Sequence, residues 1–591
     1  MRVSSMPPFI PVPPQAVSVP APPPEPVRFL PFSAQAFHES RTRHVPVFLV
    51  IAEQPPELSD ASLSMQIAER TVPVHLYPGV RRDVELLCQR AGALFSGEGA
   101  LPLCALLLED TRPFLAAPLP PAGFPLDASR LYVWLSQADR RFSQNLPALT
   151  GQAAQVIRSF RVPPLRKPYS PHDAAHDLFR ALTAVQDSIN GGFGAIKHPL
   201  PCVLRFLQHE AAAGNRSAHT ALNHALDAML ASDLYDPLDG SFFRATLTAD
   251  WRVFVPEKLL GVNALLALTL LENGRRSEAV RVLDFMLSTC ALFGGALTPV
   301  ISVSRESCAF TPEQVCAALG NEDGLRACRL LNLRRQHAPA LPHVTPSRFS
   351  PVSDLPPETP PLTPTLPASL TPEDAAFLRR VTPKLLHARA ARELPQAAPY
   401  VLSEDCALAA AVFALCGRRL GEARYIQAAQ RAVSFLIALP TAGNMPAVLP
   451  PSISPTSALS AQATCGAAGA LALALLTLGQ DDAMGEYLDC GLRTLGAALH
   501  AFTTRDGMPM HTPQDAAAFF PRIPALYDGE LPSPAALLLH ALALADAMRP
   551  QAGYLEASRV LWEAAAPFAR EQPLACASLI DAANITLSKS P

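Results

Sequence analysis

The chain has 591 residues, which is too long for one hydrophobic core and predicts two or three domains. Hydrophobic residues make up 49% of it, so it has ample material for these cores. The net charge is −3, and a nucleic-acid-binding protein normally has a basic face, so we expect no nucleic-acid partner.

No segment of the sequence predicts a membrane span or a cleaved signal peptide. The most apolar run, at 467–479, has about 13 residues, whereas a membrane span needs about 20, so we interpret it as a buried core helix. The N-terminus contains proline too often for the apolar helix of a signal peptide. We therefore expect a cytoplasmic protein without a membrane partner.

The twelve cysteines contain no CxxC pair, which argues against a thioredoxin-type redox pair and against a zinc ribbon. Most of them lie in apolar helical runs such as 408–416 (LAAAVFALC), which is typical of buried thiols in a reducing compartment. No phosphate-binding glycine loop follows a predicted strand. We expect neither a metal nor a cofactor.

The first two regions of the chain are a tail and an α/β domain. Residues 1–27 are rich in proline and lack helical periodicity, which predicts an extended, disordered tail. Residues 28–147 alternate apolar strand patterns with amphipathic helices, and Asp60 is the expected N-cap of the first helix. The predicted elements are a strand at 47–52, a helix at 60–70, a strand at 71–76, a helix at 84–94 and a strand at 103–108. This order is that of a thioredoxin-like fold, in which Pro102 fits the place of a cis-proline.

From 148 to 591 strands almost vanish, and helical segments follow one another. Many carry apolar residues at i, i+3, i+4 and i+7. Thirteen helices in hairpin succession are enough for an all-α toroid of six hairpins, (α/α)6, with a helical solenoid as the alternative. Frequent prolines at 337–372 predict a disordered insertion. The predicted helices are 174–189, 202–213, 217–231, 256–271, 276–287, 312–319, 375–392, 402–416, 423–439, 458–478, 483–502, 532–548 and 553–569.

Five fragments carry the most distinctive letters: 45–51 (VPVFLVI), 99–102 (GALP), 191–199 (GGFGAIKHP), 234–266 (LYDPLDGSFFRATLTADWRVFVPEKLLGVNALL) and 527–534 (YDGELPSP). In order and approximate spacing they resemble the spermatogenesis-associated protein 20 family over about residues 28–590. The resemblance implies a thioredoxin-like domain followed by a six-hairpin, glycosidase-like toroid similar to that of the N-acylglucosamine 2-epimerases. It identifies the chain as a diverged member of that family.

The family's redox motif is absent from this chain. In the family a CHWCH motif follows the first strand, and the matching cysteine positions here are Pro56 and Ser59. Residues 28–87 contain no cysteine, so a shift of the alignment restores no thiol. The resemblance therefore implies a thioredoxin-like domain without dithiol activity.

The block at 234–266 keeps the family's pattern most closely. Its aromatic, basic and amide side chains are of the types that line sugar pockets, where rings cover the apolar face of a pyranose and polar groups bind its hydroxyls. By this resemblance the binding candidates are Tyr235, Phe242, Arg244, Trp251, Lys258 and Asn263. Three acids also match the family and are the candidate catalytic residues: Asp236, Glu257 and Asp528.

Each of these acids also has a structural interpretation. Asp236 can cap a turn, Glu257 suits the first turn of a helix, and Asp528 stands before a glycine in a common turn pair. Other pocket elements of the family are missing, because the segment at 296–304 reads ALTPVISVS where the family has an acidic cluster.

Two hypotheses follow for the function. In the first, the chain is a pseudoenzyme that acts as a binding or scaffold protein and keeps a carbohydrate-type pocket. In the second, it is a carbohydrate-active enzyme, glycosidase- or epimerase-like, whose acids Asp236, Glu257 or Asp528 face one cavity with the aromatic candidates. A sugar or sugar derivative is the expected ligand of either, and the sequence names no protein partner. A toroid mouth closed by the first domain favours a structural role, and an open one favours ligand binding.

Overall fold

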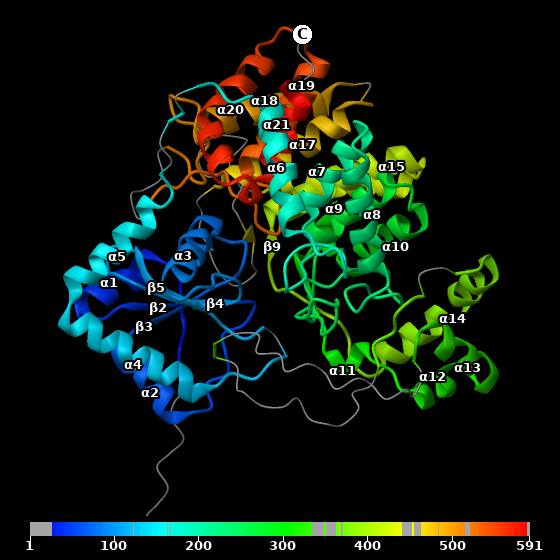
Figure 1. Cartoon of the computed structure of the whole chain (residues 1–591), viewed down its shortest axis with the longest axis horizontal. Coiled ribbons are helices and arrows are strands. Elements are labelled where there is room, and N and C mark those ends of the chain that lie inside the picture. Colours follow the sequence, from blue (N-terminus) through cyan, green and yellow to red (C-terminus); the bar gives the residue numbers. More distant parts are fainter. Residues whose placement is uncertain are drawn as a thin grey trace, which may run out of the picture.

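The computed structural model describes residues 27–121, 123–161, 164–165, 167–333, 348–349, 362–367, 370–439, 452–453, 463–482, 484–514 and 520–587. The tail predicted at 1–27 lies outside these residues, except for Val27. Most of the insertion predicted at 337–372 also lies outside them, and its last residue, Pro372, begins a helix. The described residues form a sheet unit (27–161), blue to cyan in Figure 1, and a helical part beside it (167–587).

Five strands form one mixed sheet in the order β1-β3-β2-β4-β5. β1, β3 and β2 are parallel, whereas β4 and β5 are antiparallel to their neighbours. β2 is a continuous apolar run and is buried along its whole length, as a central strand with both faces covered must be. This sheet is compatible with a thioredoxin-like domain. The strands are β1 (Leu30–Pro31), β2 (Val47–Ile51), β3 (Val72–Leu76), β4 (Leu103–Leu107) and β5 (Pro113–Pro118).

The three predicted strands are confirmed as β2, β3 and β4. β1 and β5 are edge strands that the pattern does not predict, because one has two residues and the other is bounded by prolines. The N-cap at Asp60 is also confirmed, since its side chain accepts a hydrogen bond of 2.7 Å from the Leu63 amide. The peptide bond between Leu101 and Pro102 is cis, as expected.

Helices cover both faces of the sheet. α1 (Ala34–Arg43) and α3 (Arg82–Phe95) pack on one face, and α2 (Ala61–Arg70) and α4 (Ala128–Gln144) pack on the other. α5 (Leu146–Arg158) contacts β5 and contributes side chains to both hydrophobic clusters. The core of the sheet unit therefore continues past residue 147, where the sequence places the domain boundary.

Twelve described helices form a closed ring of six hairpins. Six of them make an inner circle, in which each helix contacts the next and α21 contacts α7 again. The inner helices are α7 (Pro201–Ala212), α9 (Leu260–Glu272), α15 (Ser403–Leu420), α17 (Cys465–Gly479), α19 (Pro534–Met548) and α21 (Ala577–Leu587). Each has one outer partner, in the same order: α8 (Arg216–Leu230), α10 (Arg276–Thr289), α16 (Ala423–Ile437), α18 (Glu486–Phe502), α20 (Tyr554–Glu571) and α6 (Pro171–Val185).

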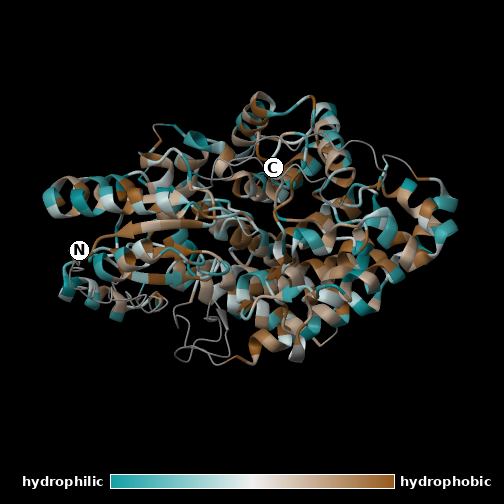
Figure 2. Cartoon of the chain, turned by 90° about the horizontal axis from the view of Figure 1, so that it is seen from below, coloured by the Kyte–Doolittle hydropathy of each residue, from teal (hydrophilic) through white to brown (hydrophobic). Residues whose placement is uncertain are grey.

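Apolar patterning explains the two circles. Inner helices such as α9 and α17 are buried around almost their whole circumference, whereas outer helices such as α16 have one buried stripe. In Figure 2 the visible strand arrows are brown, and helices at the edge of the molecule alternate brown with teal. The (α/α)6 toroid is confirmed by this closure, which an open solenoid lacks. Among the described residues, no helix has the length and apolarity to cross a membrane.

The ring differs from the prediction in its members. The predicted helices at 312–319 and 375–392 belong to a side cluster with its own hydrophobic core, made of α11 (Arg305–Cys308), α12 (Pro312–Leu319), α13 (Asn321–Leu330) and α14 (Pro372–Ala390). The ring is completed by α21, a short helix that the sequence analysis does not include. The predicted helix at 256–271 begins only at Leu260, because residues Glu257–Leu259 form a strand, β6.

Candidate functional site

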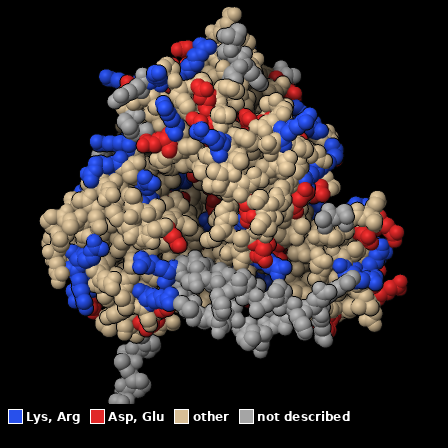
Figure 3. Space-filling view, viewed as in Figure 1, with Lys and Arg blue, Asp and Glu red and all other residues tan. Residues whose placement is uncertain are grey.

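A cavity of about 320 Å³ lies between the sheet unit and the mouth of the ring. Figure 3 shows a hollow between the two parts, with acidic and basic side chains at its rim. The sheet unit contributes Glu53, Pro78, Gly79, Arg82, Glu85, Leu86, Gln89, Ala100 and Leu101. The ring contributes His198, Pro199, Leu200, Pro201, Arg244, Leu259, Val262, Pro299, Val300, Leu402, Asp405, His511, Tyr527, Gly529, Glu530 and Leu531.

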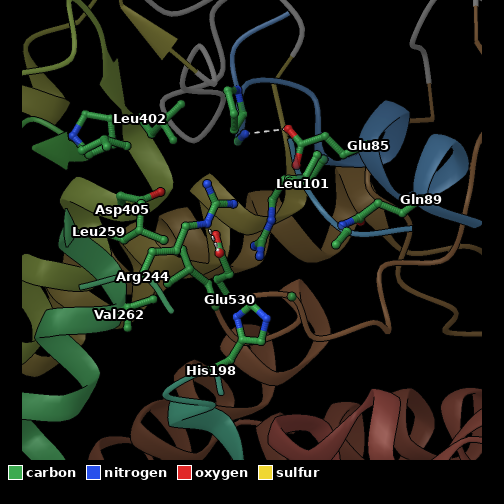
Figure 4. Close-up of a pocket in the computed structure, with 18 of the residues that line it drawn as sticks. Glu85, Gln89, Leu101, His198, Arg244, Leu259, Val262, Leu402, Asp405 and Glu530 are labelled. Atoms are coloured by element: carbon green, nitrogen blue, oxygen red, sulfur yellow. Dashed lines mark hydrogen bonds and ion pairs between the residues drawn. The ribbon is translucent and has the colours of Figure 1, made fainter. Parts of the chain in front are cut away.

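Strand direction brings the sheet unit's residues together. Glu53 follows the end of β2 and Pro78 follows the end of β3, and parallel strands end at the same edge of a sheet. Leu101 precedes β4, which is antiparallel to β2 and therefore begins at this edge. In Figure 4, Glu85, Gln89 and Leu101 lie on the side of the sheet unit, opposite the residues of the ring.

The sheet unit is held over the mouth by polar and aromatic contacts. Arg82 forms an ion pair with Glu404 at the start of α15. The Tyr400 hydroxyl donates to the Glu53 carboxyl, 3.0 Å from each oxygen. The rings of Phe160 and Tyr527 meet edge to face at a centroid distance of 5.4 Å. The mouth is therefore covered, and a cavity remains beneath the cover.

Arg244 is the one predicted binding residue that lines this cavity. Its Nη1 atom lies 2.7 Å from an oxygen of Glu257, and its Nε atom lies 2.6 Å from an oxygen of Glu530. Although burial alone would lower the pKa of Arg244, the two carboxylates raise it above its ordinary value. The guanidinium thus stays charged, and Figure 4 shows it facing Glu530.

Three cavity carboxyls have strongly raised pKa values. Burial, followed by the nearby Glu257, raises the pKa of Glu53 to about 8. Burial raises the pKa of Glu85 to about 7, and burial with the neighbouring Glu404 raises that of Asp405 to about 7. Burial thus disfavours the ionised form of all three groups, and a protonated carboxyl can donate a hydrogen bond.

Two histidines add uncharged polar groups. His511 is 3% exposed, and burial lowers its pKa to about 4, so its ring is neutral at physiological pH. Its Nε2 atom has no hydrogen-bond partner among the described residues. Burial also lowers the pKa of His198. Both rings line the cavity, where a neutral imidazole can bind a hydroxyl or an amine.

The predicted acid Asp236 lies in a buried ion-pair network, away from the residues that line the cavity. Its carboxylate lies 2.8 Å from Nζ of Lys258 and 2.7 Å from Nη1 of Arg389. Although burial alone would raise the pKa of Asp236, Arg389 and Lys258 hold it well below its ordinary value. Lys258 also pairs with Asp239. This network joins the segment before α9 to α14, so it ties the side cluster to the ring.

The other two predicted acids also have partners in the fold. Asp528 accepts hydrogen bonds from the backbone amides of Ser533, at 2.9 Å, and Ser578, at 2.8 Å, which joins its loop to α21. Glu257 does not line the cavity, but its carboxylate accepts a hydrogen bond from Arg244, which does. The expectation that these acids face one cavity with the aromatic candidates is therefore not met here, because none of Asp236, Glu257 and Asp528 lines it.

The remaining binding candidates hold two distinctive segments together. The Tyr235 and Phe242 rings pack at 4.9 Å, and the side chain of Asn263 bonds both backbone groups of Phe242. The Trp251 indole donates to the Asn190 carbonyl at 2.8 Å. A Cβ atom at Gly192 would lie 2.5 Å from the Trp251 ring. Packing explains these residues, and none of Tyr235, Phe242, Trp251, Lys258 and Asn263 lines the cavity.

The sheet unit places no thiol at the cavity. Pro56 and Ser59 lie between β2 and α2, where the resemblance places the redox motif. The unit's cysteines, Cys88 and Cys104, are buried, and burial raises the pKa of each thiol well above its ordinary value. Thiolate chemistry is disfavoured at both positions.

Sequence reasoning missed most of the polar lining. Glu53, Glu85, Asp405 and Glu530 come from four segments that are distant in sequence. A partial signal existed for two of them, because Glu53 follows a predicted buried strand and Glu530 lies in the fragment at 527–534. No pattern indicated that the sheet unit covers the ring and brings the four together.

No family model matches the sequence, and no curated protein is similar to it in sequence. Among solved structures, a D-mannose isomerase is similar with a TM-score of 0.42 at 10% identity, over 67% of this chain and 85% of that one. A cellobiose 2-epimerase from Bacillus thermoamylovorans B4167 gives 0.41 at 9% identity, over 66% and 86%. A family 76 glycoside hydrolase from a bovine Bacteroides thetaiotaomicron strain gives 0.42 at 9%, over 71% and 78%. Similarity at this level supports no inference about activity.

Proposed function

We propose that this chain binds a small polyhydroxylated ligand of the sugar class in the cavity shared by the sheet unit and the ring. The observation that carries the proposal is the convergence of carboxyl, guanidinium, imidazole and amide groups on one cavity that also has apolar walls. Hydroxyl groups need such paired donors and acceptors, and leucine, valine and proline side chains suit the apolar face of a sugar ring. The volume of about 320 Å³ is at the lower end of the range for small-molecule sites.

The proposal includes an origin for the chain as a diverged, redox-inactive relative of the spermatogenesis-associated protein 20 family. The strand order of the mixed sheet, the cis bond at Pro102 and the closed ring of hairpins support it. In this view the first unit is a thioredoxin-like domain that supplies one wall of the site. The twelve cysteines are free, which fits a cytoplasmic location.

A carbohydrate-active enzyme is the second candidate function. It is favoured by the protonated state of Glu53, Glu85 and Asp405 beside Glu530, which Arg244 binds directly. Carboxyl groups held in one cavity with different environments, of which one keeps its proton, are the arrangement that general acid–base catalysis uses. The acids in these roles would then differ from the predicted Asp236, Glu257 and Asp528.

Calorimetric titration with a panel of monosaccharides, amino sugars and disaccharides tests the binding proposal. We expect at least one of them to bind the full chain, and Val262→Phe to abolish its binding, because Val262 lines the cavity and a larger ring would fill it. The matched control is Val133→Phe on α4, since Val133 is 52% exposed and outside the cavity. A ligand at about 100 times its dissociation constant should also stabilise the fold by roughly 2.7 kcal/mol.

No binding across the panel, or equal binding by Val262→Phe and wild type, would overturn the proposal. The second candidate requires turnover as well as binding. Nuclear magnetic resonance spectra of the bound sugars would show new anomeric or epimeric signals, which Glu53→Gln should abolish.

A further inference from the structure

The cavity holds more acidic groups than its basic groups can neutralise. Glu53, Glu85, Asp405 and Glu530 line it, against two arginines. Both arginines already form ion pairs. Arg82 pairs with Glu404, which does not line the cavity, and Arg244 pairs with Glu257 and Glu530. Three carboxyls, those of Glu53, Glu85 and Asp405, are therefore left without an ion pair among the described residues.

The groups that contact these three carboxyls directly are uncharged. Glu53 accepts from the Tyr400 hydroxyl at 3.0 Å, and Glu85 accepts from the Gly79 amide at 2.5 Å. The backbone of Gly261 lies close to Asp405 and lowers its pKa slightly against the effect of burial. A neutral donor orients a carboxylate without cancelling its charge, so ionising these groups in the closed cavity is costly until a cation arrives.

The charged groups around the three carboxyls also leave an excess of acids over bases. The groups that act on the three carboxyls are Arg82, Asp83, Arg244, Glu257, Tyr400, Glu404 and Glu530. Four of these are acids and two are bases. Because the histidines of the cavity are neutral, they add no positive charge.

A second observation fits a hydrogen-bond donor on the ligand. The Nε2 atom of His511 is buried at the cavity without a partner among the described residues. When the ring proton is on Nδ1, Nε2 is an acceptor. An ammonium group has three donors and no acceptor, so it can donate to an uncharged imidazole nitrogen as well as to carboxylates of the same cavity.

We propose that the ligand carries a primary ammonium group, as an amino sugar does, and that this group binds among Glu53, Glu85 and Asp405. Binding then ionises the carboxyls that contact it, and their protons pass to the solvent. The inference rests on the proposed function, because it specifies the chemistry of the ligand at the same cavity.

Three related sugars test it by calorimetric titration of the full chain at pH 7: glucosamine, N-acetylglucosamine and glucose. We expect glucosamine to bind at least about tenfold more tightly than the other two, which is about 1.4 kcal/mol. Repeating the titration in buffers of different ionisation enthalpy should show net proton release with glucosamine and none with the neutral sugars. The reason is that a nearby cation lowers the pKa of a carboxyl.

Two variants locate the ammonium group. Asp405→Asn and Glu85→Gln each keep the shape of the side chain, and at least one of them should weaken glucosamine about tenfold while leaving N-acetylglucosamine within about twofold. Glu556→Gln on α20 is the matched control, because Glu556 is 69% exposed. Equal affinities for the three sugars without proton release would overturn the inference and leave the proposed function standing. No binding of any sugar in the whole panel would overturn the proposed function itself.

Discussion

At the scale of single residues, the buried charges of this protein fall into two groups. Asp236, Lys258 and Arg389 are paired within the fold, whereas Glu53 and Asp405 line the cavity and form no ion pair with the residues that the structure describes. The sequence could identify Asp236 and Lys258 as distinctive. It could not tell whether they form a structural ion pair or a sugar-binding site, since both need the same residue types. In the second group, only Glu53 has a sequence signal, its place after a predicted buried strand, and the convergence of the two carboxyls becomes visible only when the units are placed together.

A substitution at Asp236 tests the structural role of the first group. We predict that Asp236→Asn lowers the free energy of unfolding by about 3–5 kcal/mol, because Lys258 and Arg389 lose a buried counter-charge. Urea denaturation of wild type and variant measures the change. Asp323→Asn, which breaks an exposed pair with Arg380, should leave the free energy of unfolding nearly unchanged, because solvent screens that pair. Equal effects of the two substitutions would contradict this assignment.

The second group predicts how stability depends on pH. Glu53 has an ordinary pKa of 4.5 that is raised to about 8 in the fold, so between these values the native state binds more protons than the unfolded state. The stabilisation is complete below about pH 4.5 and is lost as pH rises toward 8. Glu85 and Asp405 act in the same direction up to about pH 7.

We therefore predict that the free energy of unfolding falls between about pH 6.5, the ordinary pKa of the buried histidines, and pH 8, by at most about 1.4 kcal/mol per pH unit for each such group. Urea denaturation at several pH values measures the slope, and Glu53→Gln should make it shallower. A free energy that stays flat or rises over this interval would show that Glu53 is ionised in the native state.

At the scale of elements, the sequence predicts what local patterns determine. The buried strand β2, the capped helix α2 and the helices of the ring, apart from α21, follow from apolar periodicity and capping residues. The edge strands β1 and β5 escape prediction because pairing with a neighbour, rather than their own pattern, makes them strands. α21 is short and becomes a helix of the ring through its packing between α19 and α7. Which helices belong to the ring is thus a tertiary property.

At the scale of the whole molecule, the way the sheet unit packs against the ring determines where the cavity lies and which residues line it. The sequence predicts both units but not that residues after the strand ends and at the start of α3 line a cavity together with residues of the ring. A covered mouth alone would favour a structural role. The polar cavity beneath the cover favours a ligand, and the ion pair of Arg82 with Glu404 shows that charged groups also hold the cover in place.

A crystal structure of the full chain soaked with glucosamine tests most directly that the two units share one binding site. The account predicts density for the sugar within the cavity, with its ammonium group beside carboxylates and with contacts to side chains of both units, such as Gln89 and Asp405. A sugar bound elsewhere, or bound by residues of the ring alone with the sheet unit displaced, would contradict it.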